Sequence, residues 1–232
     1  MKKVFIGTSG YTYNHWKGRF YPENLPQNQT FKYYCKNFNT VEINSSFYHS
    51  FKKESYKRWR KDSPEDFKFF IKGHRYITGV KRLKEVEDSV EFFFDGVFEL
   101  KEKLAGVLWQ FPPNFKLTED TEERLKHFLS ILPDKILHVF EFRHESWFNN
   151  KIYEFLKSNN TAFVLTKIEQ DIITADFIYI RFHGPGEIDN LKQWAQKLKN
   201  WREKYDIYAY FNNDANANAV KNAKELIELT SM

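Results

Sequence analysis

The sequence predicts an α/β protein, a single parallel (β/α)8 barrel of the TIM type that spans residues 1–232. Three observations support this fold class. Eight short runs rich in β-branched and aromatic residues recur along the chain, and amphipathic helical patterns lie between them. No Gly/Ser linker or low-complexity tract divides the chain. Strands that alternate with helices pair in parallel, and eight is the number that closes such a barrel.

The predicted strands are short apolar or alternating segments. They cover residues 4–8, 40–44, 67–72, 106–111, 137–142, 162–166, 177–183 and 207–212. An open, doubly wound sheet made from the same elements is the alternative architecture.

Apolar residues three and four positions apart predict the helices between these strands. The clearest stripe contains Val90, Phe93, Phe94, Val97, Leu100 and Leu104. Thr118 is the expected N-cap of a second helix that contains Leu125 and Phe128. Further stripes occupy residues 191–201 and the stretch after Asp214. The segments after strands one and six are shorter or less regular, so the barrel is expected to be irregular there.

The composition is that of a folded protein, with 41% hydrophobic and 29% charged residues, which excludes wholesale disorder. Aromatic residues make up 19%, more than a core needs, so some are expected to line a pocket or a surface. The formal net charge of +5 is compatible with an anionic ligand or with nucleic acid.

Cellular location is predicted from the cysteine content and the N-terminus. Cys35 is the only cysteine, which suits a reducing compartment. The apolar run after Met1 is too short for a signal peptide, and no segment reaches the length of a membrane span. We therefore expect a cytoplasmic protein with no membrane partner.

Strand alternation predicts where a functional site would lie. Alternate side chains of a barrel strand face the interior and the surrounding helices. This parity turns polar side chains inward near the C-terminal strand ends, where barrel enzymes assemble their sites. These residues are Glu42, Asn44, Lys72, Gln110, Glu141, Arg143, Arg181, His183 and Asn212.

Two interpretations of these charges are open. Unpaired buried charges cost several kcal/mol each, so the residues form either a functional site or a structural salt-bridge network. In both cases Glu141 is expected within ion-pair reach of an Arg or a Lys.

The loops contribute weaker signals. Residues 7–10, Gly-Thr-Ser-Gly, resemble an anion-binding turn but equally fit a plain turn. The glycine-rich residues 183–186 and the pair Asn213 and Asp214 follow the two strands whose loops often bind phosphate in barrels. Asp214 also fits an ordinary N-cap. Trp147 lies just past strand five, where it would form a pocket wall or pack in the core.

No organic cofactor is indicated, because Walker and Ser-x-Gly patterns are absent. The sequence has no close His-x-His or Cys-rich spacing, so a divalent metal would need ligands from separate strands. Glu42, Glu141, His183 and Asp214 are the residues that could supply them, and this signal is weak.

Six motifs follow one another along nearly the whole chain. They are GTSGYTYNHWKGRFYP at 7–22, FNTVEINSSFY at 38–48, GVLWQFPPNF at 106–115, EFRHESW at 141–147, TADFIYIRFHG at 174–184 and YFNNDANANAVKNA at 210–223. Together they resemble the YecE-like family, known as domain of unknown function seventy-two. The resemblance implies a TIM-barrel-like domain without an established activity.

Matching the family pattern adds residues around the same rim. The matched positions are Gly7, Thr8, Ser9, Gly10, Tyr13, Trp16, Glu42, Tyr48, Gln110, Pro112, Glu141, Arg143, His144, Trp147, Arg181, His183, Gly184, Asn212, Asn213 and Asp214. The chain departs from the pattern twice. Gly79 stands where the family usually has a histidine, and a tyrosine-bearing loop after His183 is reduced to residues 185–189.

The leading functional hypothesis is an enzyme that acts on a small, polar, anionic substrate, phosphorylated or sugar-like, by acid/base chemistry at the C-terminal rim. Glu141, Glu42 and His183 are the candidate catalytic residues. The candidate substrate-binding residues are Thr8, Ser9, Tyr13, Trp16, Lys72, Gln110, Arg143, Trp147, Arg181, Asn212, Asn213 and Asp214.

Hydrolysis, isomerisation and lyase chemistry all fit these residues. One rival hypothesis is a nucleic-acid-binding or repair-associated protein, which the basic charge and the aromatic rings would suit. The other is a ligand-binding barrel without catalysis. The sequence leaves the oligomeric state open.

Overall fold

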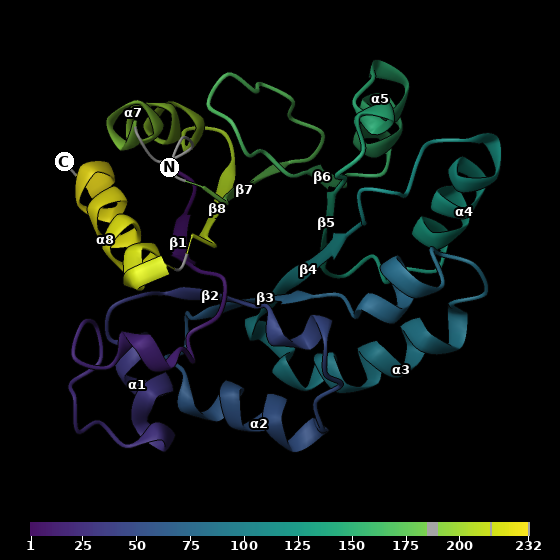
Figure 1. Ribbon diagram of the computed structural model, residues 1–232. Coiled ribbons are helices and arrows are strands. Elements are labelled where there is room, and N and C mark those ends of the chain that lie inside the picture. Colours follow the sequence, from purple (N-terminus) through teal and green to yellow (C-terminus); the bar gives the residue numbers. More distant parts are fainter. Residues whose placement is uncertain (185–189, 214, 232) are drawn as a thin grey trace.

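The computed structural model describes residues 1–184, 190–213 and 215–231, with short parallel strands at the centre and helices outside them (Figure 1). Every strand pair in these ranges is parallel. The strands are β1 Val4–Thr8, β2 Thr40–Ile43, β3 Lys68–Lys72, β4 Leu104–Gln110, β5 Leu137–Glu141, β6 Ala162–Phe163, β7 Phe177–Phe182 and β8 Asp206–Phe211. Each lies within or overlaps a predicted run.

The strands form two sheets, a five-stranded one in the order β2-β3-β4-β5-β6 and a three-stranded one in the order β1-β8-β7. One parallel bridge joins Ser9 to Glu42, where Gly10 N donates to Glu42 O at 2.7 Å. A second joins Leu165 to Ile180, just past the end of β6. The α/β class with parallel sheets is therefore confirmed, and the two sheets contact each other at both edges.

Helices fill most of the connections between consecutive strands and lie on the outside of the sheets (Figure 1). Thr118 caps α4 as predicted, with its hydroxyl accepting from Thr121 N. The α-helices are α1 Thr30–Cys35, α2 Lys53–Asp62, α3 Glu87–Val97, α4 Glu119–Ser130, α5 Asn150–Ser158, α7 Leu191–Trp201 and α8 Asn218–Ser231. The 3-10 segments are Asn14–Trp16, Gln27–Gln29, Ser45–Phe47, Phe98–Lys103, Glu145–Trp147 and Ala215–Ala217, and Tyr76–Val80 is a π-helix.

The connections after β1 and β6 are irregular, as the sequence predicts. The first contains only two 3-10 turns and the short α1, and the second, residues 164–176, contains no helix. Lys197 on α7 holds the second connection, because its Nζ donates to the backbone oxygens of Ile168 and Gln170 and pairs with Asp171. A side chain from a neighbouring helix thus replaces the missing helix as the support of this segment.

The helix predicted to extend to Leu104 is shorter in the structure. α3 ends at Val97 and passes into the 3-10 segment Phe98–Lys103, where Lys101 has φ 49° and ψ −125°. That left-handed conformation interrupts the helical hydrogen bonds, so Leu104 begins β4 instead. The apolar spacing predicted a helix as far as Leu104 because Leu104 and Leu100 pack in the same core cluster, although they belong to different elements.

The core divides as the strand parity predicts. Inward-facing side chains from both sheets form one aromatic-rich cluster in which the Phe70 ring lies 4.7 Å from Tyr179 and 4.9 Å from Tyr208. The opposite strand faces pack against the helices in two larger clusters. In the described part of the chain, no helix is long and apolar enough to cross a membrane.

Candidate functional site

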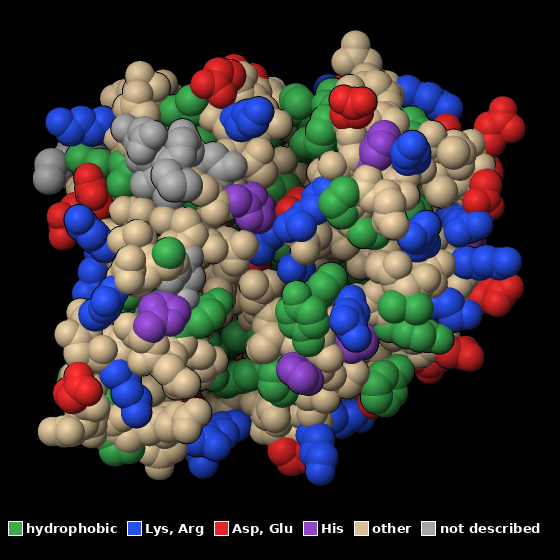
Figure 2. All heavy atoms as spheres, viewed as in Figure 1, with side chains coloured by type: hydrophobic (Ala, Val, Ile, Leu, Met, Phe, Trp, Pro, Cys, Tyr) green, Lys and Arg blue, Asp and Glu red, His purple; other side chains and the backbone are tan. Residues whose placement is uncertain are grey.

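The charged residues predicted from strand parity lie at the C-terminal ends of neighbouring strands. Lys72, Gln110 and Glu141 are the last residues of β3, β4 and β5, and Glu42 and Arg181 are the last but one of β2 and β7. Because the strands are parallel, these ends share one side of the molecule. Figure 2 shows Lys, Arg and His side chains around a hollow near the centre of this face.

Arg181 joins two carboxylates from different strands. Its Nη2 donates to Glu42 Oε1 at 2.8 Å and its Nη1 to Glu141 Oε2 at 2.5 Å. Tyr179 Oη also donates to Glu42, at 2.5 Å from Oε2. The Arg181 and Glu42 side chains have no solvent exposure. Burial opposes the charge of Arg181, but the two carboxylates raise the pKa of the guanidinium, so it remains a cation.

Glu141 accepts hydrogen bonds or ion pairs from four side chains. Besides Arg181, its partners are Gln110 Nε2 at 2.7 Å from Oε1, Arg143 Nε at 3.3 Å and His183 Nε2 at 3.4 Å. Burial by itself raises the pKa of Glu141, but Arg181, His183 and Gln110 outweigh it and hold the pKa well below its ordinary value. The expected ion pair of Glu141 is confirmed, and the group is an ionised acceptor at neutral pH.

His183 lies between Glu141 and an asparagine pair. Asn212 Nδ2 is 3.3 Å from His183 Nδ1, and Asn44 Nδ2 is 3.4 Å from Asn212 Oδ1. An Asn212 amide that donates to Nδ1 places the imidazole proton on Nε2, which faces Glu141. The His183 side chain keeps 25% of its surface exposed, so it is a titratable group of this cluster that a solute can reach.

Lys72 adds a cation without a bonded counter-ion. In the described part of the chain its Nζ has no hydrogen bond and no carboxylate within 4.0 Å, and it lies 4.2 Å from the centroid of the Phe47 ring. Burial and the Arg181 charge lower the pKa of Lys72 to about 8, against the opposite effect of Glu42 and Glu141. Counting the described residues alone, the cluster therefore contains three cations, Lys72, Arg143 and Arg181, for two carboxylates.

Several enclosed polar atoms near these strand ends lack a hydrogen-bond partner among the described residues. They are Ser9 Oγ, Asn44 Oδ1, Asn213 Oδ1 and Arg181 Nε. An enclosed polar atom without a partner costs roughly 1–3 kcal/mol. A bound polar molecule that bonded such atoms would recover part of that cost.

A cavity of about 360 Å³ opens beside the charged cluster. Glu141, Arg143 and His183 supply its charged and titratable lining. The sequence did not single out its other lining residues, Phe142, Phe148, Phe163, Val164, Thr166 and Gln170. Four of these, at positions 163, 164, 166 and 170, belong to β6 or to the helix-free connection after it, where the sequence shows no helical stripe. The cavity combines charge on one side with aromatic rings on the other.

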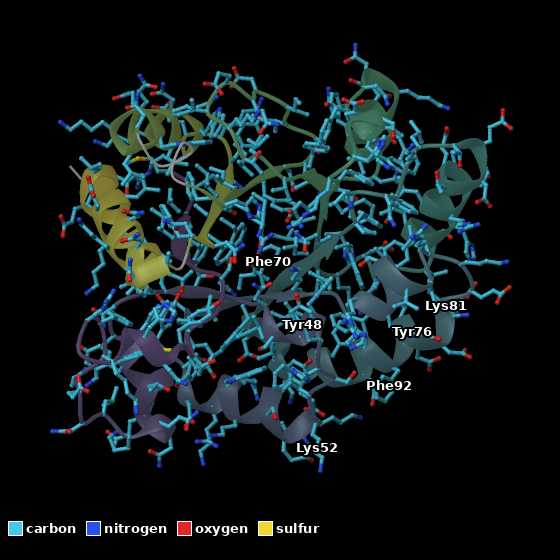
Figure 3. The ribbon with its side chains drawn as sticks, viewed as in Figure 1. Tyr48, Lys52, Phe70, Tyr76, Lys81 and Phe92 are labelled. Atoms are coloured by element: carbon cyan, nitrogen blue, oxygen red, sulfur yellow. The ribbon has the colours of Figure 1, made fainter. Side chains whose placement is uncertain are left out.

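A second cavity, of about 690 Å³, lies between the segment before α2 and α3. Tyr76 and Phe92 line it and are 42% and 68% exposed. Figure 3 shows these two residues at the outer face, with Tyr48 nearer the centre. The expectation that some aromatic residues line a pocket is confirmed.

Four predicted binding residues have structural contacts instead of an open face. Thr8 is buried and its hydroxyl donates to Gly10 O at 2.6 Å. Tyr13 Oη donates to Ser9 O at 2.6 Å. Trp16 is buried in the core cluster against aromatic neighbours. Trp147 is fully buried, stacks on the Phe142 ring at 4.5 Å, and its Nε1 donates to Phe115 O at 2.6 Å.

Of the two sequence interpretations of Trp147, a pocket wall or packing in the core, these contacts favour packing. Its ring is enclosed on both faces, because Phe115 stacks at 5.2 Å on it as well. Gly10, with φ +89° and Tyr13 Oη 2.7 Å from the place of a Cβ, is required by the turn itself. Thr8, Gly10, Tyr13 and Trp16 thus shape the rim through packing and backbone contacts.

Two predicted features lie outside the described residues. They are Asp214 and the short loop 185–189. In the described ranges, no group of three or more His, Cys, Asp or Glu side chains is arranged to hold a metal ion.

The fold and the site define a class: a parallel α/β protein with a charged cluster at the carboxyl ends of its strands. The chain belongs to the family described as "Protein of unknown function DUF72", whose model matches residues 5–232. This confirms the resemblance that the six sequence motifs indicate.

Relatives and solved structures agree with this membership. The chain is 27% identical to YunF of Bacillus subtilis, over 97% of this chain and 94% of that protein. It is 31% identical to YecE of Escherichia coli K12, over 50% of this chain and 42% of that protein. The crystal structure of a DUF72 family protein from Thermotoga maritima matches 99% of this chain and all of that chain with a TM-score of 0.88 and 29% identity. A DUF72 family protein from Enterococcus faecalis matches with a TM-score of 0.83 at 18% identity, which shows a shared fold.

Proposed function

We propose that this protein is an enzyme that binds a small anionic substrate at the carboxyl ends of its strands and acts on it by acid/base chemistry. The observation that carries the proposal is the charge imbalance of the cluster. Among the residues that the structure describes, Lys72, Arg143 and Arg181 face only Glu42 and Glu141, and the Lys72 ammonium pairs with neither carboxylate. A purely structural network would gain stability from a third carboxylate or from the loss of the lysine.

We further propose that the two sheets form one (β/α)8 barrel and one domain. The supporting observations are the two bridges that connect the sheets and the single interior cluster built from both of them. In such a barrel the cluster occupies the end where active sites are built. Phosphorylated and sugar-like metabolites suit a rim with these cations and amides.

The exposed and the enclosed members of the cluster have different parts in this proposal. His183 is the proton carrier, because it is accessible and linked to an ionised carboxylate. Arg143, whose side chain is 45% exposed, binds the anionic group of the substrate. Glu42, enclosed between Tyr179 and Arg181, is a positioning residue that holds the guanidinium in place.

In this proposal Glu141 acts as an ionised acceptor and not as the general acid that the residue type also allows. A carboxylate with a lowered pKa and four partners is ionised at neutral pH and has no proton to donate. It therefore orients His183 and stabilises a developing imidazolium. His183 is therefore the proposed general acid in place of Glu141.

Surface charge gives the nucleic-acid hypothesis less support than the bare composition does. Several basic side chains on the helices are paired with acidic neighbours: Lys53 with Asp95, Arg60 with Glu102, Lys126 with Glu122 and Glu123, and Lys151 with Glu122. Pairing leaves less positive field to attract a phosphate backbone.

A cytoplasmic location remains part of the proposal. Cys35 is a free thiol of intermediate burial, and burial raises its pKa to about 12. A thiol of this kind is protonated at neutral pH and is neither a disulfide partner nor a reactive thiolate.

Anion binding tests the proposal directly. Inorganic phosphate and phosphorylated sugars should raise the unfolding temperature of the wild-type protein, and the parent neutral sugars should not. Arg143→Gln should abolish the increase. Arg60→Gln is the matched control, because Arg60 is also a partly exposed arginine paired with a glutamate but lies on α2. An Arg143→Gln protein with an unchanged response would overturn the proposal.

Catalysis is tested separately from binding. Wild-type protein and His183→Ala, incubated with a metabolite extract and followed by NMR, should differ in one consumed anionic metabolite. Binding without any His183-dependent turnover would support the rival hypothesis of a non-catalytic barrel.

A further inference from the structure

Two lysines of this chain are buried to the same degree but bonded very differently. Lys72 and Lys103 are each 6% exposed. The Nζ of Lys103 donates to Arg60 O at 2.7 Å, Ser63 O at 2.7 Å and Ser63 Oγ at 3.0 Å. Its three protons thus have three acceptors, which is how a structural lysine is accommodated in an interior.

Lys72 has none of these acceptors in the described part of the chain. Its Nζ has no hydrogen bond, and it is not among the fully enclosed polar atoms without a partner, so the nitrogen reaches solvent. The Phe47 ring lies on one side at 4.2 Å. A lysine whose stem is buried and whose amine is unbonded and accessible has the arrangement of a nucleophile rather than of a structural cation.

Charged groups from three strands act on the amine. They are Glu42 on β2, Glu141 and Arg143 at and after β5, and Arg181 on β7. Arg181 binds both carboxylates through its two terminal nitrogens, whereas in the described part of the chain neither carboxylate lies within 4.0 Å of the Lys72 amine. The lysine is therefore not held in an ion pair.

We propose that Lys72 is a Schiff-base-forming residue and that the substrate of this site is a small anionic carbonyl compound, an aldehyde or a ketone that bears a carboxylate or a phosphate. This inference rests on the proposed function, whose anion-binding group Arg143 it uses. The lowered pKa of Lys72, about 8, agrees with it. About half of the amine is neutral at pH 8, roughly a hundredfold more than for an ordinary lysine of pKa about 10.4.

The step balances without any further reactant. The Lys72 nitrogen forms a bond to the carbonyl carbon, the carbon–oxygen double bond breaks, and the oxygen leaves as water. Starting from the ammonium form, two of its three protons leave with that water and one remains on the iminium. The iminium then draws electrons from the neighbouring carbon bonds, which favours proton abstraction or carbon–carbon cleavage next to it.

Reductive trapping tests the inference. The full-length protein is incubated at pH 8 with glyoxylate, pyruvate or glyceraldehyde 3-phosphate, and with neutral glycolaldehyde, each with sodium cyanoborohydride. Intact-mass and peptide mass spectrometry then locate the secondary amine. We expect stoichiometric labelling of Lys72 by at least one anionic compound, at least tenfold faster than labelling by glycolaldehyde, and no labelling of Lys103.

Variants separate this inference from the proposed function. Lys72→Arg keeps a cation but cannot form a Schiff base, and Lys72→Met removes the charge, so both should lose the adduct, with folding checked by circular dichroism. Arg143→Gln should slow labelling by the anionic compounds without slowing labelling by glycolaldehyde.

The outcomes are distinct. Anions that stabilise the protein through Arg143 without any adduct on Lys72 would overturn this inference and leave the proposed function standing. An adduct on Lys72 that forms equally with neutral and anionic carbonyls would overturn the substrate class. Labelling spread over surface lysines, with Lys72 no faster than the rest, would overturn the nucleophile assignment.

Discussion

The guanidinium of Arg181 and the carboxylate of Glu141 contact each other at 2.5 Å across β7 and β5, two strands that are not neighbours in either sheet. The arginine side chain has no exposure and the glutamate retains 6%. Arg181 is therefore at the inner end of the cluster and Glu141 at its border with solvent. This difference in solvent exposure separates residues that hold the cluster together from residues that a substrate can reach.

Arg181→Gln is expected to destabilise the protein strongly. The change leaves Glu42 and Glu141 without their shared cation, and Glu42 has no exposure to water. Breaking a buried ion pair from one side costs about 3–5 kcal/mol. Urea denaturation at pH 7 measures the free energy of unfolding. Arg124→Gln, in a surface pair with Asp120, is the control and should change it by less than about 1 kcal/mol. A loss below 1 kcal/mol in Arg181→Gln would show that the carboxylates do not depend on the guanidinium.

Glu141 is expected to make the protein sensitive to acid. Its pKa is lowered in the folded state, so its contribution to stability is complete above the unfolded value of about 4.3 and is lost as the pH falls below it. Glu141→Gln removes this term, and its stability should therefore fall less than that of the wild type between pH 5 and pH 3. Parallel stability curves for the two proteins in this window would contradict the assignment.

The strands could be predicted well from the sequence, and the charged cluster followed from them. Alternation with a period of two is local, so the sequence alone places Glu42, Lys72, Glu141 and Arg181 on one face and at one end of the strands. Their pairing was not predictable. Which carboxylate Arg181 binds, and that it binds both, depends on distances between strands that are up to 139 residues apart in the chain.

Helix ends and side-chain roles were harder to predict. The stripe through Leu104 continues in space although the helix ends at Val97, because apolar spacing records burial and not hydrogen bonding. Trp147 fits a rim position equally well as a pocket wall or as packing, and the Phe115 carbonyl that decides the matter is 32 residues away. The cavity residues on the connection after β6 carry no periodic pattern at all.

Trp147→Phe is expected to affect stability but not ligand binding. Phenylalanine retains the stacking on Phe115 and Phe142 but cannot donate to the Phe115 carbonyl, which is left enclosed. The loss of such a bond costs about 1–3 kcal/mol. Calorimetry with inorganic phosphate should give the wild-type affinity under conditions where the variant is folded. A change in affinity as large as that of Arg143→Gln would return Trp147 to the binding surface.

Lys72→Met is expected to stabilise the protein at neutral pH. The folded-state pKa of Lys72, about 8, lies below the unfolded value of about 10.4, so the folded state opposes protonation of this group. Its unfavourable contribution is present in full below pH 8 and is relieved as the pH rises toward 10.4, because the unfolded chain binds more protons in that interval. The difference corresponds to roughly 3 kcal/mol. Urea denaturation at pH 7, 8, 9 and 10 should therefore show wild-type stability rising relative to Lys72→Met, with the largest difference in favour of the variant at pH 7.

Lys103→Met is the matched control and should be destabilised at every pH, since it leaves the acceptors of Arg60 and Ser63 without a donor. A Lys72→Met protein that is as unstable as Lys103→Met would mean that the lysine holds the fold together, and the nucleophile assignment would lose its basis.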